Sequence, residues 1–198
     1  MSKDAKHCAG AAPMKRISIA QGSWQYVPGY LDGGQADRLL SWLLRKVRWQ
    51  TEEIFLFGQK RQVPRLVAWF GDAGCCYRYS HIDHPCTGWP QPLTPLTEKV
   101  GNTVGARPDF LLLNRYRSGS DSMGWHADDE EMVGHVISSI SLGCTRRFLI
   151  RTEPGRAATK LDLEHGSLLL MDRRLPHCLP KTTRPIGERV NLSFRTLA

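Results

Sequence analysis

The sequence has no long apolar run and no ordered pattern of cysteines. A helix that crosses a membrane needs about 20 consecutive apolar residues, and no stretch of the 198 residues approaches that length. The six cysteines include no Cys-x-x-Cys pair, which disfavours a zinc knuckle or a thioredoxin-like motif. The only apolar stretch near the start, Ala9–Ala12, is too short for a secretory signal. These absences predict a soluble, cytoplasmic protein without disulfides.

Acidic residues are scarce relative to basic ones. Lysine and arginine total 27 and aspartate and glutamate 19, a net charge of +8. The excess favours a polyanionic partner, because nucleic-acid affinity depends largely on phosphate neutralisation, although a generally basic protein would explain it as well. No repeat, low-complexity stretch or domain linker is present. We expect a flexible tail over residues 1–16 and a single, monomeric domain over residues 17–198.

Two helices are expected in the first half of the chain. Asp32 is a suitable cap for a helix over Asp32–Trp49, in which leucines recur at helical spacing. A second helix begins at Thr94-Pro95, since proline is favoured in the first turn. The segment between them, residues 49–80, is expected to be extended.

From Pro108 onward, short runs of β-forming residues replace the helical pattern. The expected strands are Phe110–Tyr116, His135–Leu142, Phe148–Arg151, Leu161–Leu163, Ser167–Met171 and Arg189–Phe194. The helices precede these strands rather than alternating with them, which disfavours a doubly wound parallel sheet. The pattern predicts a mainly β fold with flanking helices (α+β), arranged as a sandwich or jelly roll.

Two histidines and an aspartate form the first candidate site. His126 and Asp128 are two residues apart, so they point the same way if the chain is extended there. His177 follows at long range, shortly after the apolar run Leu168–Met171. Two imidazoles and one carboxylate can bind one face of an iron(II) ion and leave the other open. An isolated His-x-Asp pair is more often a surface or hydrogen-bonding feature.

The strand expected over Arg189–Arg195 carries the second candidate site. Its alternate residues put Arg189, Asn191, Ser193 and Arg195 on one face and Val190, Leu192 and Phe194 on the other. A cationic, hydrogen-bonding face suggests a buried site for a small dianion, and together with the metal triad it points to 2-oxoglutarate. The two arginines lie up to ~20 Å apart along a strand. One is therefore expected to bind the far carboxylate and the other to approach the metal.

Three smaller features have a functional and a bland interpretation. Asn114 and Tyr116 share a strand face and are candidates for the co-substrate carboxylates, or form the polar side of an edge strand. Asp129 and Glu130 could meet a cationic substrate, or belong to a solvated acidic loop. Phe57, beside a glycine, could wedge between bases as apolar residues of DNA-kinking proteins do, or could be a core aromatic.

Phosphate contacts are the last group of candidates from the residues alone. Each of these side chains is individually an ordinary surface charge. They are Arg61, Arg65, Arg78, Arg146, Arg147, Arg173, Arg174, Lys181 and Arg184.

Taken together, these motifs resemble the AlkB family of DNA-alkylation repair dioxygenases, and most closely its subgroup that acts on double-stranded DNA. The matching stretches span roughly residues 50 to 197. They are Phe57-Gly58, Val63–Arg65, Phe70–Gly74, Tyr77–Ser80, Asn114–Tyr116, His126–Glu130, His177–Pro180 and Arg189–Arg195.

The resemblance implies a double-stranded β-helix that binds Fe(II), with 2-oxoglutarate and O2 as co-substrates. A nucleotide-recognition lid would lie within about residues 50–107, before a catalytic core over residues 108–198. The implied reaction is oxidative demethylation of 1-methyladenine and 3-methylcytosine in DNA, coupled to decarboxylation of 2-oxoglutarate to succinate with release of formaldehyde. Both lesions are cationic and have lost Watson–Crick pairing, which suits acidic side chains and makes base flipping easier.

The resemblance also implies a set of residues that contact the base and the DNA. Tyr79 and Ser80 correspond to a position where an aromatic side chain stacks on the flipped base. The full implied set is Phe57, Gly58, Gln59, Arg65, Tyr77, Arg78, Tyr79, Ser80, Asp129 and Glu130. Trp125 departs from the family pattern, in which a smaller or charged residue often precedes the metal histidine.

Two other functions are compatible with the sequence. The same chemistry could act on RNA, a protein or a small metabolite, although the basic charge and Phe57 disfavour a metabolite. A jelly-roll binding module with a degenerate site is the second, and the complete set of expected ligands argues against it. We expect DNA as the partner, double-stranded and also single-stranded.

Overall fold

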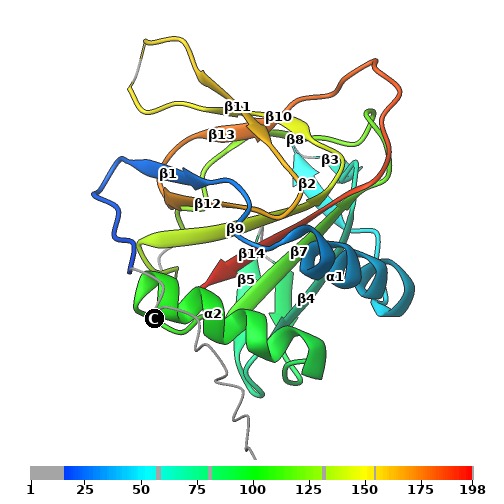
Figure 1. Cartoon of the computed structure of the whole chain (residues 1–198). Helices are drawn as coiled ribbons and strands as arrows, with labels where there is room; N and C mark the ends of the chain where they lie inside the picture. Colours follow the sequence, from blue (N-terminus) through cyan, green and yellow to red (C-terminus); the bar gives the residue numbers. More distant parts are fainter. Residues whose placement is uncertain (1–15, 57–58, 80–81, 131–132, 154, 198) are drawn as a thin grey trace, which may run out of the picture.

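Two antiparallel sheets face each other, and two helices cover the outside of the larger one (Figure 1). The computed structural model describes residues 16–56, 59–79, 82–130, 133–153 and 155–197. No helix in these ranges is long and apolar enough to cross a membrane. The mainly β jelly roll expected from the sequence is confirmed.

The two sheets share one continuous path of the chain. From β7 to β14 the chain passes repeatedly between them, which defines a double-stranded β-helix. The larger sheet has the order β1 (Trp24–Val27), β12 (Ser167–Asp172), β9 (Val136–Gly143), β14 (Arg189–Arg195), β7 (Phe110–Tyr116), β4 (Leu66–Gly71). The smaller sheet has the order β11 (Thr159–Leu163), β10 (Arg146–Ile150), β13 (His177–Leu179), β8 (Met123–His126).

Two hairpins lie outside these sheets. They consist of β2 (Glu53–Leu56) with β3 (Gln59–Gln62), and β5 (Cys76–Tyr79) with β6 (Ile82–Pro85). His84 of β6 is buried, and its Nε2 lies 2.8 Å from Oε1 of Glu52. This contact joins the second hairpin to the segment that leads into the first.

The helices begin and end close to where local signals place them. The Asp32 carboxylate accepts a hydrogen bond from the backbone N–H of Gln35 at 2.8 Å and caps α1 (Gly33–Lys46). This helix ends before Trp49 because Val47 is already extended. A short 3-10 turn, η1 (Gln91–Leu93), precedes α2 (Thr94–Val104), which ends at Gly105 in the left-handed conformation (φ 79°) that favours glycine.

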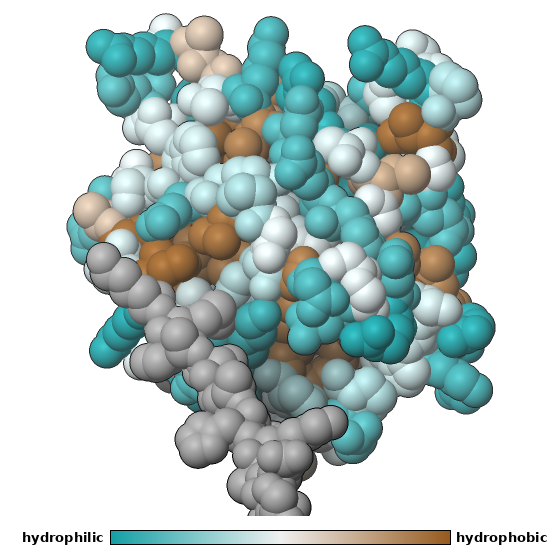
Figure 2. Space-filling model, viewed as in Figure 1, coloured by the Kyte–Doolittle hydropathy of each residue, from teal (hydrophilic) through white to brown (hydrophobic). Residues whose placement is uncertain are grey.

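Strand alternation divides the interior into two cores. On β14, Val190, Leu192 and Phe194 pack toward the helices, in the same cluster as Leu111 and Leu113 of β7. The other face of these strands points between the two sheets, where a second apolar cluster forms. Polar side chains interrupt this second core along β14, β7 and β9. On the outside, the face seen in Figure 2 is mostly hydrophilic, with hydrophobic residues in separate patches.

Candidate active site

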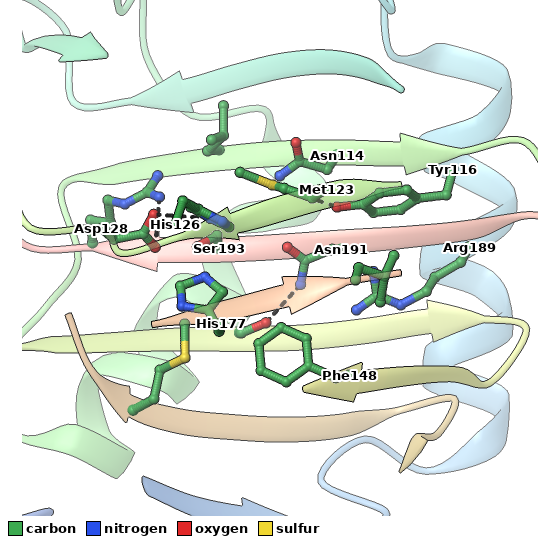
Figure 3. A pocket seen from close by; sticks show the side chains of 15 residues that line it. Asn114, Tyr116, Met123, His126, Asp128, Phe148, His177, Arg189, Asn191 and Ser193 are labelled. Carbon is green, nitrogen blue, oxygen red and sulfur yellow. Dashed lines mark hydrogen bonds and ion pairs between the residues drawn. The ribbon is translucent and has the colours of Figure 1, made fainter. Parts of the chain in front are cut away.

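Two neighbouring strands of the smaller sheet bring the predicted metal ligands together. His126 of β8 and His177 of β13 are direct cross-strand partners, with ring centroids 4.2 Å apart. Asp128 follows β8, and its backbone N–H donates to the Arg173 carbonyl at 2.9 Å. One ligand atom from each of these three side chains lies within 4.8 Å of the others. The predicted triad therefore exists as a cluster (Figure 3).

Backbone carbonyls define which nitrogen each histidine can offer. His126 Nδ1 lies 2.9 Å from the Gly124 carbonyl, and His177 Nδ1 lies 2.8 Å from the Leu175 carbonyl. A carbonyl only accepts, so each Nδ1 carries the proton and donates it. Each Nε2 is then left with its lone pair, the arrangement usual for a metal-binding histidine.

Burial and nearby charges keep Asp128 and His126 in the forms that bind metal. Burial raises the pKa of Asp128, but Arg195 and the two histidines outweigh burial and hold that pKa at about 2. Arg195 Nη2 lies 3.0 Å from the Asp128 carboxylate, and both side chains are buried. Burial and the nearby His177 lower the pKa of His126 to about 4. At neutral pH the site thus contains a carboxylate and a neutral imidazole, which are the ligating forms.

Arg189, at the other end of β14, has a different environment. It is 2% exposed, and its guanidinium lies 5.3 Å from the centre of the Tyr116 ring. Nη2 donates to the Ser141 hydroxyl at 2.9 Å, while Nε has no hydrogen-bond partner. No carboxylate in the described ranges pairs with it, and burial lowers its pKa to about 10. A buried cation without a counter-ion is costly, so this end fits the carboxylate of a ligand.

A cavity between the sheets connects these two environments. In Figure 3 the triad lies at one end of it and Arg189 with Tyr116 at the other. Asn191 lies on the strand between them, and its amide donates to the Ser139 hydroxyl at 2.7 Å. The remaining lining includes Leu112, Asn114, Met123, Phe148, Met171, Leu179, Ser193 and Arg195. A short dianion with one end near the metal ligands and one carboxylate at Arg189 fits this arrangement.

Asn114 is hydrogen-bonded to Arg65, which was expected at the surface. Arg65 is 4% exposed, and its Nε donates to Asn114 Oδ1 at 2.6 Å. Arg146 is 2% exposed, and its guanidinium donates to three backbone carbonyls. The prediction that Arg65 and Arg146 contact phosphate at the surface is therefore wrong. Both are buried because their forked N–H donors find acceptors inside the protein.

Other predicted phosphate contacts already have acidic partners. Arg147 pairs with Asp162, where Nη2 to Oδ2 measures 2.9 Å, and Arg174 pairs with Asp172 at 3.2 Å. Arg61, Lys181 and Arg184 are exposed, and Arg173 donates to the Glu130 carbonyl. The sequence pattern of charges does not reveal the pair between Arg147 and Asp162, because its partners lie 15 residues apart and meet through strand pairing.

Tyr77 and Glu130 connect the triad to the predicted substrate side. Tyr77 is 1% exposed and lies between the Arg195 guanidinium at 4.9 Å and the Phe110 ring at 4.6 Å. Burial raises the pKa of both the tyrosine hydroxyl and the Glu130 carboxyl. Glu130 lies close enough to Tyr77, Asp128 and Arg195 for their charges to influence its pKa. Its role toward a substrate stays a prediction.

The remaining predicted substrate residues are spread over several surfaces. Asp129 and Gln59 are exposed, and Arg78 is exposed with Nε 3.0 Å from Asp83. Phe57, Gly58 and Ser80 lie outside the described residues, as does the side chain of Tyr79. These assignments stay predictions.

Sequence reasoning missed the serines that support the arginine strand. Ser139 and Ser141 lie on β9 opposite Ser193 and Asn191 of β14. Both point toward the cavity residues, since they accept hydrogen bonds from Asn191 and Arg189. Three serines in one short strand, two of them at alternate positions, were the available signal.

Comparison with known families agrees with this geometry. The profile of the 2OG-Fe(II) oxygenase superfamily matches residues 23–195, and the chain belongs to that superfamily. Two solved structures share the fold at low sequence identity. An oxidoreductase of the 2OG-Fe(II) oxygenase family from Burkholderia pseudomallei matches with a TM-score of 0.62 and 17% identity, over 87% of this chain and 84% of that one. OsALKBH1 matches with a TM-score of 0.58 and 18% identity, over 91% and 100%.

Curated relatives place the chain within the AlkB family. Mouse "DNA oxidative demethylase ALKBH2" is 35% identical over 184 residues, covering 82% of this chain and 75% of that protein. Human "Alpha-ketoglutarate-dependent dioxygenase alkB homolog 3" is 34% identical over 186 residues, covering 86% of this chain. This chain spans only 64% of the length of that human relative. The family resemblance noted in the sequence is confirmed.

Proposed function

We propose that this protein uses Fe(II), 2-oxoglutarate and O2 to demethylate 1-methyladenine and 3-methylcytosine in DNA oxidatively. One observation supports 2-oxoglutarate as the co-substrate. The His–Asp–His cluster and the buried Arg189, which has no carboxylate partner in the described ranges, lie at opposite ends of one cavity. The substrate class is supported by the names of the ALKBH2 relatives, which are DNA oxidative demethylases. Succinate, carbon dioxide and formaldehyde are the expected products besides the repaired base.

Each end of the cavity has a distinct task in this proposal. His126, Asp128 and His177 would hold the iron, and Arg195 keeps Asp128 ionised and oriented. Arg189 would bind the far carboxylate of 2-oxoglutarate in a two-pronged hydrogen bond. Bound iron, with 2-oxoglutarate and O2, supplies the oxidising power that places a hydroxyl group on the N-methyl carbon. The apolar walls at Leu112, Phe148 and Leu179 exclude water from the cavity.

The acidic residues at the metal end suit the charge of the two lesions. Methylation at these ring nitrogens makes the base cationic, and lost pairing makes it easier to flip out of the duplex. Glu130 lies near Asp128 and Tyr77, and Asp129 is exposed next to it. We assign both carboxylates to the flipped base.

The two hairpins are assigned to the nucleotide-recognition lid, within residues 50–107 of a single domain. Both precede the core strands, and the contact between His84 and Glu52 links them. We assign double-strand preference to Phe57, as a wedge that fills the gap left by a flipped base. Phe57→Ala should then lower the ratio of duplex to single-strand repair by about tenfold or more, since unstacking costs a few kcal/mol. An unchanged ratio would make Phe57 a core residue.

The function is tested by binding first and turnover second. Anaerobic titration of the protein with Fe(II) and then with 2-oxoglutarate measures whether both bind. Turnover is then measured as formaldehyde release and repaired base, on DNA and RNA oligonucleotides that carry one methylated base. Arg189→Ala is the control, since it should lose 2-oxoglutarate affinity while keeping the triad. Repair of RNA alone would reassign the substrate, and failure to bind 2-oxoglutarate would favour the degenerate binding module.

A further inference from the structure

Trp125 is the one exposed large hydrophobic side chain among the described residues, with 45% of its surface accessible. It directly precedes the metal ligand His126 on β8. His126 lines the cavity between the sheets, whereas the side chain of Trp125 is exposed to solvent, one residue from the candidate iron site.

An arginine accompanies this indole. The Arg151 guanidinium lies 4.5 Å from the centre of the Trp125 ring, within the range of a cation–π contact. Arg151 follows directly after β10, and its backbone N–H donates to the Pro176 carbonyl at 2.9 Å, immediately before His177. Trp125 is therefore next to one candidate metal ligand in the sequence, and Arg151 is hydrogen-bonded to the residue that precedes another.

The charge of Arg151 has no acidic partner in the described part of the chain. On the preceding strand β10, Arg147 is engaged by Asp162, with Nη2 to Oδ2 at 2.9 Å. Arg151 instead contacts the indole and donates its backbone N–H to Pro176, and its charge partly offsets the burial that raises the pKa of Cys178. An exposed planar ring beside an uncompensated guanidinium offers a stacking surface together with a positive charge. Proteins that bind single-stranded nucleic acid combine these same two elements.

A protein partner is a poorer match for this surface. Protein-binding sites present contiguous apolar patches, whereas no second large exposed hydrophobic side chain accompanies Trp125 in the described ranges. A net charge of +8 also favours an anionic occupant.

We propose that Trp125 and Arg151 form a stacking platform for an unpaired nucleotide next to the target base. The base of that nucleotide lies on the exposed part of the indole, and Arg151 binds an adjacent phosphate. This inference rests on the proposed action on DNA and adds a strand selectivity to it. A neighbouring base in a duplex is already paired and stacked, so the platform contributes mainly to single-stranded substrates. Trp125 and Phe57 would then favour opposite strand states.

Affinity for methylated oligonucleotides tests the platform. Binding of single-stranded and duplex DNA with one 1-methyladenine is measured by fluorescence anisotropy, anaerobically, with iron and 2-oxoglutarate bound. Trp125→Ala should weaken single-strand binding about tenfold, as expected for one lost base–aromatic stack, and leave duplex binding nearly unchanged. Trp125→Phe should restore most of the loss because it keeps an aromatic face, and Trp125→Leu should not.

Arginine variants separate the phosphate contact from general charge. Arg151→Ala should reduce the slope of log affinity against log salt by about one contact. Arg147→Ala is the matched control, because it removes an exposed arginine of the neighbouring strand β10 whose charge is already paired. An equal change of slope in both variants would overturn the role of Arg151.

Abasic substrates locate the nucleotide and decide the mechanism. An abasic residue is placed in turn at each position flanking the lesion. At the contacted position it should weaken binding to the wild type but not to Trp125→Ala, because both changes remove the same stack. Losses that add at every position, or equal losses on single strands and duplexes, would overturn the platform. If the wild type neither binds nor repairs methylated DNA, the proposed function itself fails; if it repairs DNA and only these ratios are unchanged, the platform alone fails.

Discussion

Arg189 and Arg195 lie at the two ends of one strand, and both are 2% exposed, yet their environments are opposite. Arg195 has the Asp128 carboxylate at 3.0 Å, and the nearby acidic groups raise its pKa although burial opposes this. Arg189 has a serine hydroxyl and an aromatic ring but no carboxylate in the described ranges, and burial lowers its pKa. With similar burial and the same residue type, one arginine is thus paired with a carboxylate of the chain and the other, in the described ranges, is not.

The difference shows how a buried charge can serve binding. A pair supplied by the chain orients a metal ligand, whereas an arginine left without an acid is ready for the acid of a ligand. Leaving a charge buried and unpaired destabilises the protein without its ligand, and binding the ligand removes that cost. The asymmetry can be tested by removing either arginine, or the groups around it.

The largest effect is expected at the metal end. His126→Ala, Asp128→Ala and His177→Ala should each abolish 2-oxoglutarate-dependent turnover, since three ligands are the minimum for this open site. Asp128→Ala should also lower the free energy of unfolding by about 3–5 kcal/mol, because Arg195 becomes a buried charge without its partner. Turnover assays and urea unfolding measure the two effects. Normal turnover in any variant would remove that residue from the triad.

At the other end, Arg189→Ala should weaken 2-oxoglutarate binding by about 2–5 kcal/mol, since a charge-assisted contact in a buried site is lost. Arg189→Lys should lose less, because it keeps the charge but not the planar fork. Anaerobic titration of the iron-loaded protein gives both affinities. Unchanged affinity in Arg189→Ala would refute the assignment of this strand to the co-substrate.

Replacing each arginine by methionine should change stability in opposite directions when metal and 2-oxoglutarate are absent. Arg195→Met leaves the Asp128 carboxylate buried without its partner and should destabilise the protein. Arg189→Met removes an unpaired charge and should be neutral or stabilising, by up to about 1–4 kcal/mol. Urea unfolding measures both. With iron present, 2-oxoglutarate should stabilise the wild type but not Arg189→Met, and destabilisation by both variants would contradict the comparison.

A smaller effect is expected with pH, in protein stripped of metal. The pKa of His126 in the folded protein is about 4, below its ordinary value of about 6.5. Between these values the unfolded chain binds a proton that the folded chain does not. The free energy of unfolding should therefore fall as pH is lowered from about 6.5 to 4, by on the order of 1–3 kcal/mol. The contribution of Asp128, whose folded pKa is about 2, is lost only below about pH 4.

Urea unfolding at several pH values between 7.5 and 4 tests this dependence, with His126→Ala as the comparison. The variant should show a shallower decline, because it lacks the group that resists protonation. The same slope in both proteins would mean that other groups cause the decline.

Local sequence signals predicted the strands whose faces differ most in polarity. Phe110–Tyr116 was expected as a strand and is β7 with the same bounds. The alternation over Arg189–Arg195 predicted both faces of β14, because residues two apart must share a face whatever the surrounding fold. The short strands β8 and β13 were not expected, since Met123–His126 and His177–Leu179 show neither clear alternation nor a long β-forming run. Pairing with their neighbours in the sheet defines them.

The sequence by itself determined the candidate metal ligands and the polar face of β14, because both follow from residue type and spacing. Only the tertiary structure decided which side chain each buried arginine contacts. Arg65 reaches Asn114 and Arg195 reaches Asp128 across 49 and 67 positions of the chain. Contacts of that length depend on strand order and register in a closed double sheet, which no local pattern of residues contains. The unpaired state of Arg189 was unpredictable for the same physical reason.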